Sequence, residues 1–233
     1  MSDSHWEYQF KRSDLESPAA RAIWDKMRSE HYVTPKDKAV LWSGLVGKRA
    51  IESDKDLALA FKDAGLRPIS MTDGGRELAK AIKAANQPGS KDPISKEDAR
   101  ILWNRASKFY AQEASGGVKV LCPDAWSSRA TLADVEIPTA LRNEKIGTLE
   151  GVPRRELLGR YEEGKHTALK ERGLLAGGPA ERGHAEAPRS YGAERVLKAL
   201  RVANIYQAPK AQREALNEAA RRVAQERQQR VRP

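Results

Sequence analysis

A tryptophan and a serine one helical turn apart are the first residues in this sequence that could do chemistry. Residues 101–113 are ILWNRASKFYAQE, in which Trp103 and Ser107 are four positions apart. Residues with this spacing lie on one face of a helix, so we expect both side chains to point the same way. A tryptophan in a helix is most often a core residue. With a small hydroxyl one turn away, it can also form the wall of a pocket for a flat, polar ligand.

Start and stop signals predict the elements that must position these side chains. Serine or threonine caps precede apolar residues at helical spacing, and glycines follow them. The expected helices cover 18–27, 35–44, 54–64, 76–85, 96–115 and 153–163. Short apolar runs predict strands, the second of them with alternating hydrophobicity. The expected strands cover 118–122, 131–137 and 145–152.

The order of these elements predicts an α/β fold, with α+β as the alternative. We expect a helical N-terminal part and a small, mostly parallel sheet with flanking helices, followed by a helical basic tail. The Gly-, Ala- and Pro-rich texture after Lys165 indicates a flexible linker. The expected domains are an N-terminal extension over 1–30, a body over 31–164, the linker over 165–192 and the tail over 193–233.

Composition excludes several classes of protein. The 233 residues are 39% hydrophobic and 32% charged, and no run approaches the roughly 20 apolar residues of a membrane helix. The N-terminus has no basic region followed by an apolar core, so it is not a secretory signal. The single cysteine, Cys122, allows no internal disulfide. The four histidines and this cysteine have no metal-ligand spacing, so we expect no metal. Because no apolar run is long enough, we also expect no membrane partner.

The net charge of +10 is concentrated in the C-terminal part of the chain. Residues 165–233 contain 15 Lys and Arg against 7 Glu, whereas residues 1–164 contain 27 against 25 acidic residues. Binding to nucleic acid would therefore involve the tail. The body offers no basic aromatic platform to support such binding, so nucleic acid is disfavoured as a partner.

Three stretches of the body agree with a known pattern in type, order and spacing. They are LWSG at 41–44, WNRASKFYAQEASGGVKV at 103–120 and TLADVEIP at 131–138. Trp42-Ser43 is followed 61 residues later by Trp103, and Thr131 precedes Glu136 by five residues. These residues resemble the ADP-ribosyl cyclase family, NAD-consuming enzymes known from animals and, as toxin domains, from bacteria.

The resemblance, which covers about residues 38–150, implies cleavage of the nicotinamide–ribose bond of NAD. Glu136 would be catalytic, because a carboxylate can stabilise the positive charge that develops on the ribose and bind its hydroxyls. Trp103, the second catalytic candidate, and Trp42 would hold the cationic nicotinamide by stacking and cation–π attraction. NAD is the substrate, and no cofactor or metal is implied. Ser107 and Thr131 would donate hydrogen bonds to phosphate or ribose, and Ser43 is a further candidate substrate-binding residue.

The segment PISMTDGG departs from the family pattern. Thr72, Gly74 and Gly75 fit, but Ser70 occupies the position of an acidic residue that helps balance hydrolysis against cyclisation in the mammalian enzymes. Asp73 would substitute for it only after a register shift. The amides of Gly74-Gly75 would bind a phosphate if they begin a helix. Ser70, Thr72, Asp73 and Gly74 are therefore candidate substrate-binding residues, and the ratio of hydrolysis to cyclisation stays open.

Each candidate also has an ordinary structural explanation. Trp42 and Trp103 would be core residues in most helices. Glu136, between Val135 and Ile137, would face solvent in an alternating strand. Only the joint pattern favours catalysis.

The tail and the lack of disulfides resemble a bacterial effector. Animal members of the family are rich in disulfides, so a version without them fits a cytosol. The C-terminus, RRVAQERQQRVRP, resembles the translocation signals of type IV secretion substrates, and a secretion adaptor would bind it. This implies a toxin made in a bacterial cytoplasm, secreted without a signal peptide and acting in the cytosol of a target cell. Such a toxin implies a cognate immunity protein.

The leading hypothesis is therefore an NAD glycohydrolase toxin that depletes NAD. An ADP-ribosyl cyclase that makes cyclic ADP-ribose is the alternative among enzymes. A module that binds nucleic acid or a partner through its basic tail is the alternative outside them, and truncation at about Lys165 should remove its salt-dependent binding. A catalytically inactive relative that only binds NAD or a partner is a further possibility.

Overall fold

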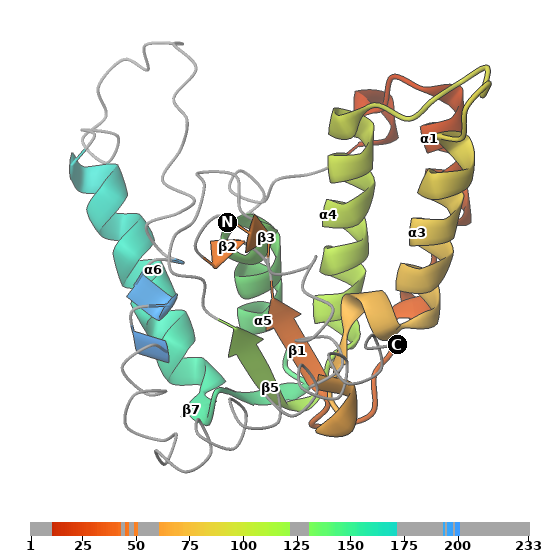
Figure 1. Cartoon of the computed structure of the whole chain (residues 1–233). Helices are drawn as coiled ribbons and strands as arrows, with labels where there is room; N and C mark the ends of the chain where they lie inside the picture. The colour runs from red at the N-terminus through yellow and green to blue at the C-terminus, as the bar shows by residue number, and fades with distance from the viewer. Residues whose placement is uncertain are drawn as a thin grey trace, which may run out of the picture.

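The computed structural model describes residues 11–42, 45–46, 49–50, 61–121, 131–171 and, except 194 and 198, residues 193–200. Its α-helices are α1 (Pro18–Lys26), α3 (Asp73–Ala85), α4 (Lys96–Glu113), α5 (Ile137–Arg142) and α6 (Arg154–Glu171). Single turns of 3-10 helix form η1 (Arg12–Asp14), η2 (Ser29–Tyr32) and η4 (Ile69–Met71), and η5 (Leu132–Glu136) is a π-helix. Figure 1 shows α1, α3 and α4 on one side of strands β1 and β5, with α6 on the other.

A five-stranded sheet has the order β4-β1-β5-β6-β7. The strands are β1 (Ala39–Trp42), β4 (Arg67–Pro68), β5 (Gly116–Leu121), β6 (Ile146–Leu149) and β7 (Val152–Pro153). All neighbours pair in parallel except β7, which is antiparallel to β6. A separate antiparallel pair joins β2 (Leu45–Val46) to β3 (Arg49–Ala50). The expected α/β class with a small, mostly parallel sheet is confirmed.

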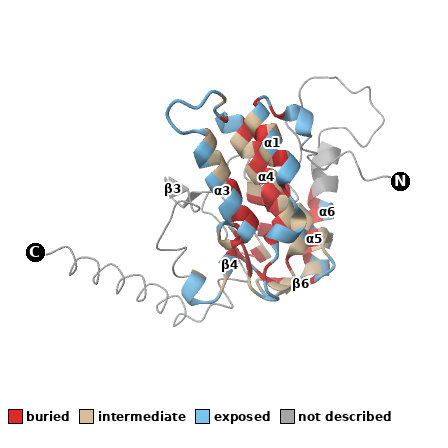
Figure 2. Cartoon of the chain, turned by 90° about the vertical axis from the view of Figure 1, so that its right-hand side faces the viewer, coloured by how far each residue is buried: buried red, intermediate tan, exposed pale blue. Residues whose placement is uncertain are grey.

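Side-chain caps begin three helices, two of them at the predicted start signals, whereas α3 begins at Asp73 and not at the expected residue 76. The Ser17 hydroxyl accepts a hydrogen bond from the amide of Ala20, the Ser95 hydroxyl accepts one from Asp98, and the Thr72 hydroxyl caps α3. α4 ends at Glu113, and the Asn143 side-chain amide donates to the last carbonyls of that helix. α4 therefore has both ends fixed, and Figure 2 shows the buried residues gathered along it.

The helix expected over 35–44 is wrong, because this segment contains a turn followed by β1. Asp37 in the turn has a positive φ of 63°, and its carboxylate accepts a hydrogen bond of 2.5 Å from the Gly117 amide at the start of β5. A short apolar run buried on both faces is typical of a parallel strand, and hydrophobic periodicity alone does not separate it from a helix. The buried residues of β1, at most 1% exposed, are Ala39, Val40 and Leu41.

The strand expected over 131–137 is also wrong, because η5 continues directly into α5. Glu136 and both of its neighbours in sequence are buried, so the alternation around it does not correspond to two faces of a strand. Adjacent buried pairs recur every four residues, which is the stripe of a helix that faces a core. These pairs are Leu132-Ala133, Glu136-Ile137 and Ala140-Leu141.

A buried carboxylate attaches the N-terminal residues to α4. Asp98 is 0% exposed, and its two oxygens accept hydrogen bonds of 2.9 Å from the amides of Glu16 and Ser17. On the same side of α4, the Arg105 guanidinium lies 3.8 Å from the centre of the Trp24 ring of α1. The capping serine Ser95 thus starts α4, while Asp98 in its first turn holds the chain that leads into α1.

Four apolar residues between 193 and 200 pack into the same core as α6. The α6 residues Leu157 and Tyr161 belong to this core, and α6 continues past 163, where its helix was expected to end. The tail residues at 0% exposure are Ala193, Val196, Leu197 and Leu200. The division of the chain into domains at 30, 164 and 192 stays a prediction.

Shortening a buried leucine of this tail segment should destabilise the whole fold. Leu197→Ala should lower the free energy of unfolding by about 2–4 kcal/mol, because the lost side chain leaves a cavity. Arg195→Ala, at a side chain that is 48% exposed, should cost less than about 0.5 kcal/mol. Denaturant unfolding of both variants measures the difference, and equal losses would contradict the packing of this segment.

Candidate functional site

α4 carries one side of the candidate site. Trp103 and Ser107 lie one turn apart on it, as predicted. Ser107 is 4% exposed, and Trp103 is half-buried and packs against the core. Asn104, next to Trp103, is 3% exposed. A tryptophan with one edge in the core and part of its ring accessible can serve as a pocket wall.

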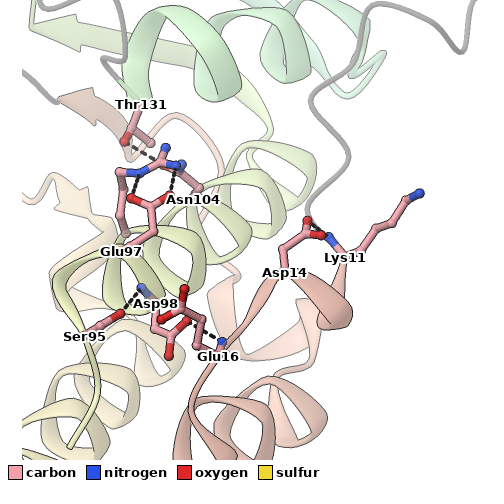
Figure 3. Close-up of polar contacts among 9 residues, drawn as sticks. Lys11, Asp14, Glu16, Ser95, Glu97, Asp98, Asn104 and Thr131 are labelled. Atoms are coloured by element: carbon pink, nitrogen blue, oxygen red, sulfur yellow. Dashed lines mark hydrogen bonds and ion pairs between the residues drawn. The ribbon is translucent and has the colours of Figure 1, made fainter.

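η5 carries the other side. Thr131 immediately precedes η5, and its hydroxyl donates a hydrogen bond of 2.7 Å to the side-chain oxygen of Asn104 (Figure 3). Glu136 ends η5 and is 1% exposed, so its carboxylate lies inside the protein. η5 packs against both α4 and β1. The structure therefore brings together the segments of Trp103, Thr131 and Glu136, which are far apart in the sequence.

Tyr110 lies near Glu136 and connects α4 to the sheet. Its hydroxyl accepts a hydrogen bond of 2.7 Å from the Val40 amide of β1 and lies 2.7 Å from the Arg67 carbonyl of β4. Burial, and to a smaller extent the charge of Glu136, raise the pKa of the Tyr110 hydroxyl well above its usual range. The tyrosine therefore stays protonated and holds α4, β1 and β4 in place beside the Glu136 carboxylate.

The sheet contributes the carboxyl end of β1. Trp42 is the last residue of β1 and pairs with Leu121, the last residue of β5. These strands are parallel, so both end at the same edge of the sheet, where open α/β sheets commonly bind ligands. Trp42 thus ends a strand and does not lie on the helix expected for it, and Ser43 lies outside the described residues.

The segment from Ser70 to Gly75 has structural roles at the start of α3. The Thr72 hydroxyl donates to the Ile69 carbonyl at 2.7 Å and accepts from the Gly75 amide at 3.1 Å. A Cβ at Gly74 would lie 2.7 Å from the Tyr32 ring. Ser70 is exposed, and Asp73 forms an ion pair with Arg76. Their involvement in substrate binding stays a prediction.

Removing the Thr72 cap should destabilise α3. Thr72→Ala should lower the free energy of unfolding by about 1–2 kcal/mol, because the Gly75 amide loses its acceptor. Thr72→Ser keeps the hydroxyl and should recover most of that loss. Thermal or denaturant unfolding of the two variants checks the cap, and an alanine variant as stable as the serine variant would contradict it.

Two residues of the site escaped sequence reasoning. Asn104 and Tyr110 are polar residues on the buried face of α4, at helical spacing from the apolar core residues. Their position among the apolar residues of this face was the signal in the sequence that could have identified them, because a buried polar residue requires a hydrogen-bond partner. Neither partner is local, since Thr131 is 27 residues from Asn104 and Val40 is 70 residues from Tyr110.

Within the described ranges, no three His, Cys, Asp or Glu side chains gather in a way that could hold a metal ion. No helix in that part of the chain has the length and apolar character to cross a membrane.

Comparisons with known proteins give a distant likeness among solved structures. No protein-family model and no curated protein matches this chain. Among solved structures, it is similar to the apo structure of porcine CD38, with 18% sequence identity and a TM-score of 0.30. That similarity covers 61% of this chain and 74% of the porcine chain. A likeness at this level does not establish a shared fold.

Proposed function

We propose that this protein is an NAD glycohydrolase, which uses water to split NAD into nicotinamide and ADP-ribose. The observation that carries the proposal is the hydrogen bond between Thr131 and Asn104. It joins the helix of Trp103 and Ser107 to the segment that ends at Glu136. The resemblance to the ADP-ribosyl cyclase family had already assigned these residues, apart from Asn104, to one reaction.

The chemistry suits a buried carboxylate. When the bond between nicotinamide and ribose breaks, positive charge develops on the ribose ring, and the bond's electron pair leaves with the nicotinamide. Glu136, at 1% exposure, would stabilise that charge more strongly than a carboxylate in water, because the surroundings screen it less. Water then bonds to the ribose carbon and releases a proton. The products are nicotinamide, ADP-ribose and that proton.

The half-buried Trp103 suits the leaving group. Nicotinamide in NAD is a flat cation, and an indole face attracts such a ring by stacking and by cation–π interaction. The attraction weakens once the ring leaves as a neutral molecule, which favours product release.

Substrate binding must include a rearrangement around Glu136. A carboxylate that is 1% exposed cannot touch a ribose until neighbouring side chains move. Enzymes that exclude water from a reactive centre commonly undergo such a change on binding.

The direct test is the time course of NAD incubated with the purified full-length protein, with products separated by chromatography. We expect nicotinamide and ADP-ribose to appear in equal amounts. Trp103→Phe keeps an aromatic face and should retain more activity than Trp103→Ala. Cyclic ADP-ribose as the main product would change the reaction from hydrolysis to cyclisation. No loss of NAD would overturn the proposal.

A toxin that depletes NAD in the cytosol of a target cell is the biological setting that we propose. Two features support it: the chain has one cysteine, so its fold needs no disulfide, and its C-terminal part is basic. In this setting the producing cell needs a cognate immunity protein, and the tail would bind a secretion adaptor.

A further inference from the structure

The bond between Thr131 and Asn104 has a direction that limits what Thr131 can bind. A threonine hydroxyl has one proton to donate and lone pairs that accept. In this structure the proton goes to the Asn104 side-chain oxygen, 2.7 Å away (Figure 3). Asn104 is 3% exposed and sits in the middle of α4, so its acceptor is fixed in place. Toward a ligand, Thr131 can therefore act only as an acceptor.

The two parts of NAD that could contact Thr131 differ in whether they can donate a hydrogen bond. The pyrophosphate oxygens are ionised at neutral pH and have no proton to donate, whereas each ribose hydroxyl has one. Arg100, one turn before Asn104 on α4, is also held within the chain, because its Nε donates to Glu97 at 2.9 Å. The surroundings of Thr131 therefore suit a sugar hydroxyl better than a phosphate.

The π-helix places this acceptor on the same side as the carboxylate. Thr131 and Glu136 are separated by five residues, and a π-helix bonds residue i to residue i+5, so the two lie about one turn apart. One ribose can therefore contact both side chains.

We infer that Asn104 is a positioning residue that makes Thr131 an acceptor for a hydroxyl of the nicotinamide ribose. This inference rests on the proposed function. It departs from a role for Thr131 as a donor to phosphate, and it adds Asn104 to the residues that determine substrate recognition.

Two ligands separate the ribose role from the phosphate role. ADP contains the pyrophosphate without the second ribose, and ADP-ribose contains both. In Thr131→Val, calorimetry should show binding of ADP-ribose weakened about fivefold to tenfold, the loss of one hydrogen bond, with ADP binding unchanged. Thr131→Ser keeps the hydroxyl and should bind both ligands like the wild type. Equal weakening for ADP and ADP-ribose would assign Thr131 to phosphate and overturn the inference, as would unchanged binding of ADP-ribose.

Variants at Asn104 test its control of Thr131. Asn104→Ala should reduce the preference for ADP-ribose over ADP, and in a protein that already carries Thr131→Val the same change should reduce it no further. The carboxylate in the Asn104→Asp variant can only accept hydrogen bonds, so a folded variant should preserve the preference for ADP-ribose over ADP. Loss of the preference in a folded Asn104→Asp protein would mean that Asn104 donates to Thr131, and would overturn the inference.

A second measurement does not depend on NAD chemistry. The effects of Asn104→Ala and Thr131→Ala on unfolding should be non-additive in the double variant, because each removes the same contact. Additive effects would show that the contact is absent and would end the inference. If the contact is present but the wild type releases no nicotinamide and binds neither ligand, the proposed function fails, and the substrate role of Asn104 fails with it.

Discussion

Glu136→Gln should lower the rate of nicotinamide release by about 10²–10⁴-fold and leave the fold intact. Glutamine has nearly the same size and can still accept a hydrogen bond from a ribose hydroxyl. It lacks the negative charge that would stabilise the charged ribose, so the loss should fall on kcat more than on the affinity for NAD. Steady-state assays of nicotinamide release, with unfolding curves of both proteins, measure the two effects.

Glu156→Gln is the matched control for this substitution. Glu156 is on α6 with a side chain 50% exposed, so the same change of charge occurs at an exposed side chain and not at the buried carboxylate. This variant should release nicotinamide at the wild-type rate. If Glu136→Gln keeps full activity while folded, Glu136 is a structural core residue and the catalytic assignment is wrong.

Among substitutions that remove a hydrogen-bonding side chain, Asp98→Ala should destabilise this fold most. The variant should lose about 2–4 kcal/mol in the free energy of unfolding. The Asp98 carboxylate, which is 0% exposed, accepts a hydrogen bond of 2.9 Å from the amide of Glu16 (Figure 3) and another of 2.9 Å from the amide of Ser17. Alanine leaves both amides without their acceptor and opens a gap between α4 and the chain that enters α1.

Two further variants separate this contact from a general effect of charge. Asp98→Asn keeps one carbonyl oxygen and should lose an intermediate amount of stability, because one amide retains an acceptor. Glu30→Ala removes a carboxylate from an exposed position and should change stability by less than about 0.5 kcal/mol. Denaturant unfolding compares the three. An Asp98→Ala protein as stable as Glu30→Ala would contradict the anchoring role of Asp98.

Helices with local signals were predictable from the sequence. Ser17 and Ser95 each cap a helix by accepting a hydrogen bond from the amide three residues later, so the start signal and its partner lie within one turn. Thr72 caps α3 in the same way, although we expected that helix to begin only at residue 76. β5 was predictable too, because its apolar run follows the glycines that end the preceding segment. These features depend on residues that are close together in the sequence, so local patterns are enough to predict them.

β1 and η5 were mispredicted because tertiary packing overrides local pattern. Thr34-Pro35 has the form of a helix start, but the chain turns at Asp37 and enters a strand buried on both faces. In 131–137, the alternation of apolar and polar residues suggested a strand with Glu136 in solvent. The helix instead buries Glu136 against the protein, which the sequence alone could not reveal.

The site was predictable in part. The sequence singled out Trp103, Ser107, Thr131 and Glu136, and the structure brings their segments together at α4 and η5. Asn104 and Tyr110 escaped notice because their hydrogen bonds reach across 27 and 70 residues. Their roles exist only once α4 has packed against η5 and the sheet.

The most direct test of the central claim is a crystal structure of the Glu136→Gln protein with intact NAD bound. The account predicts the nicotinamide ribose within hydrogen-bond reach of the side chain at position 136, the Thr131 oxygen accepting from a ribose hydroxyl, and the nicotinamide ring against Trp103. NAD bound elsewhere, with position 136 still sealed in the core, would contradict the claim that this carboxylate cleaves NAD.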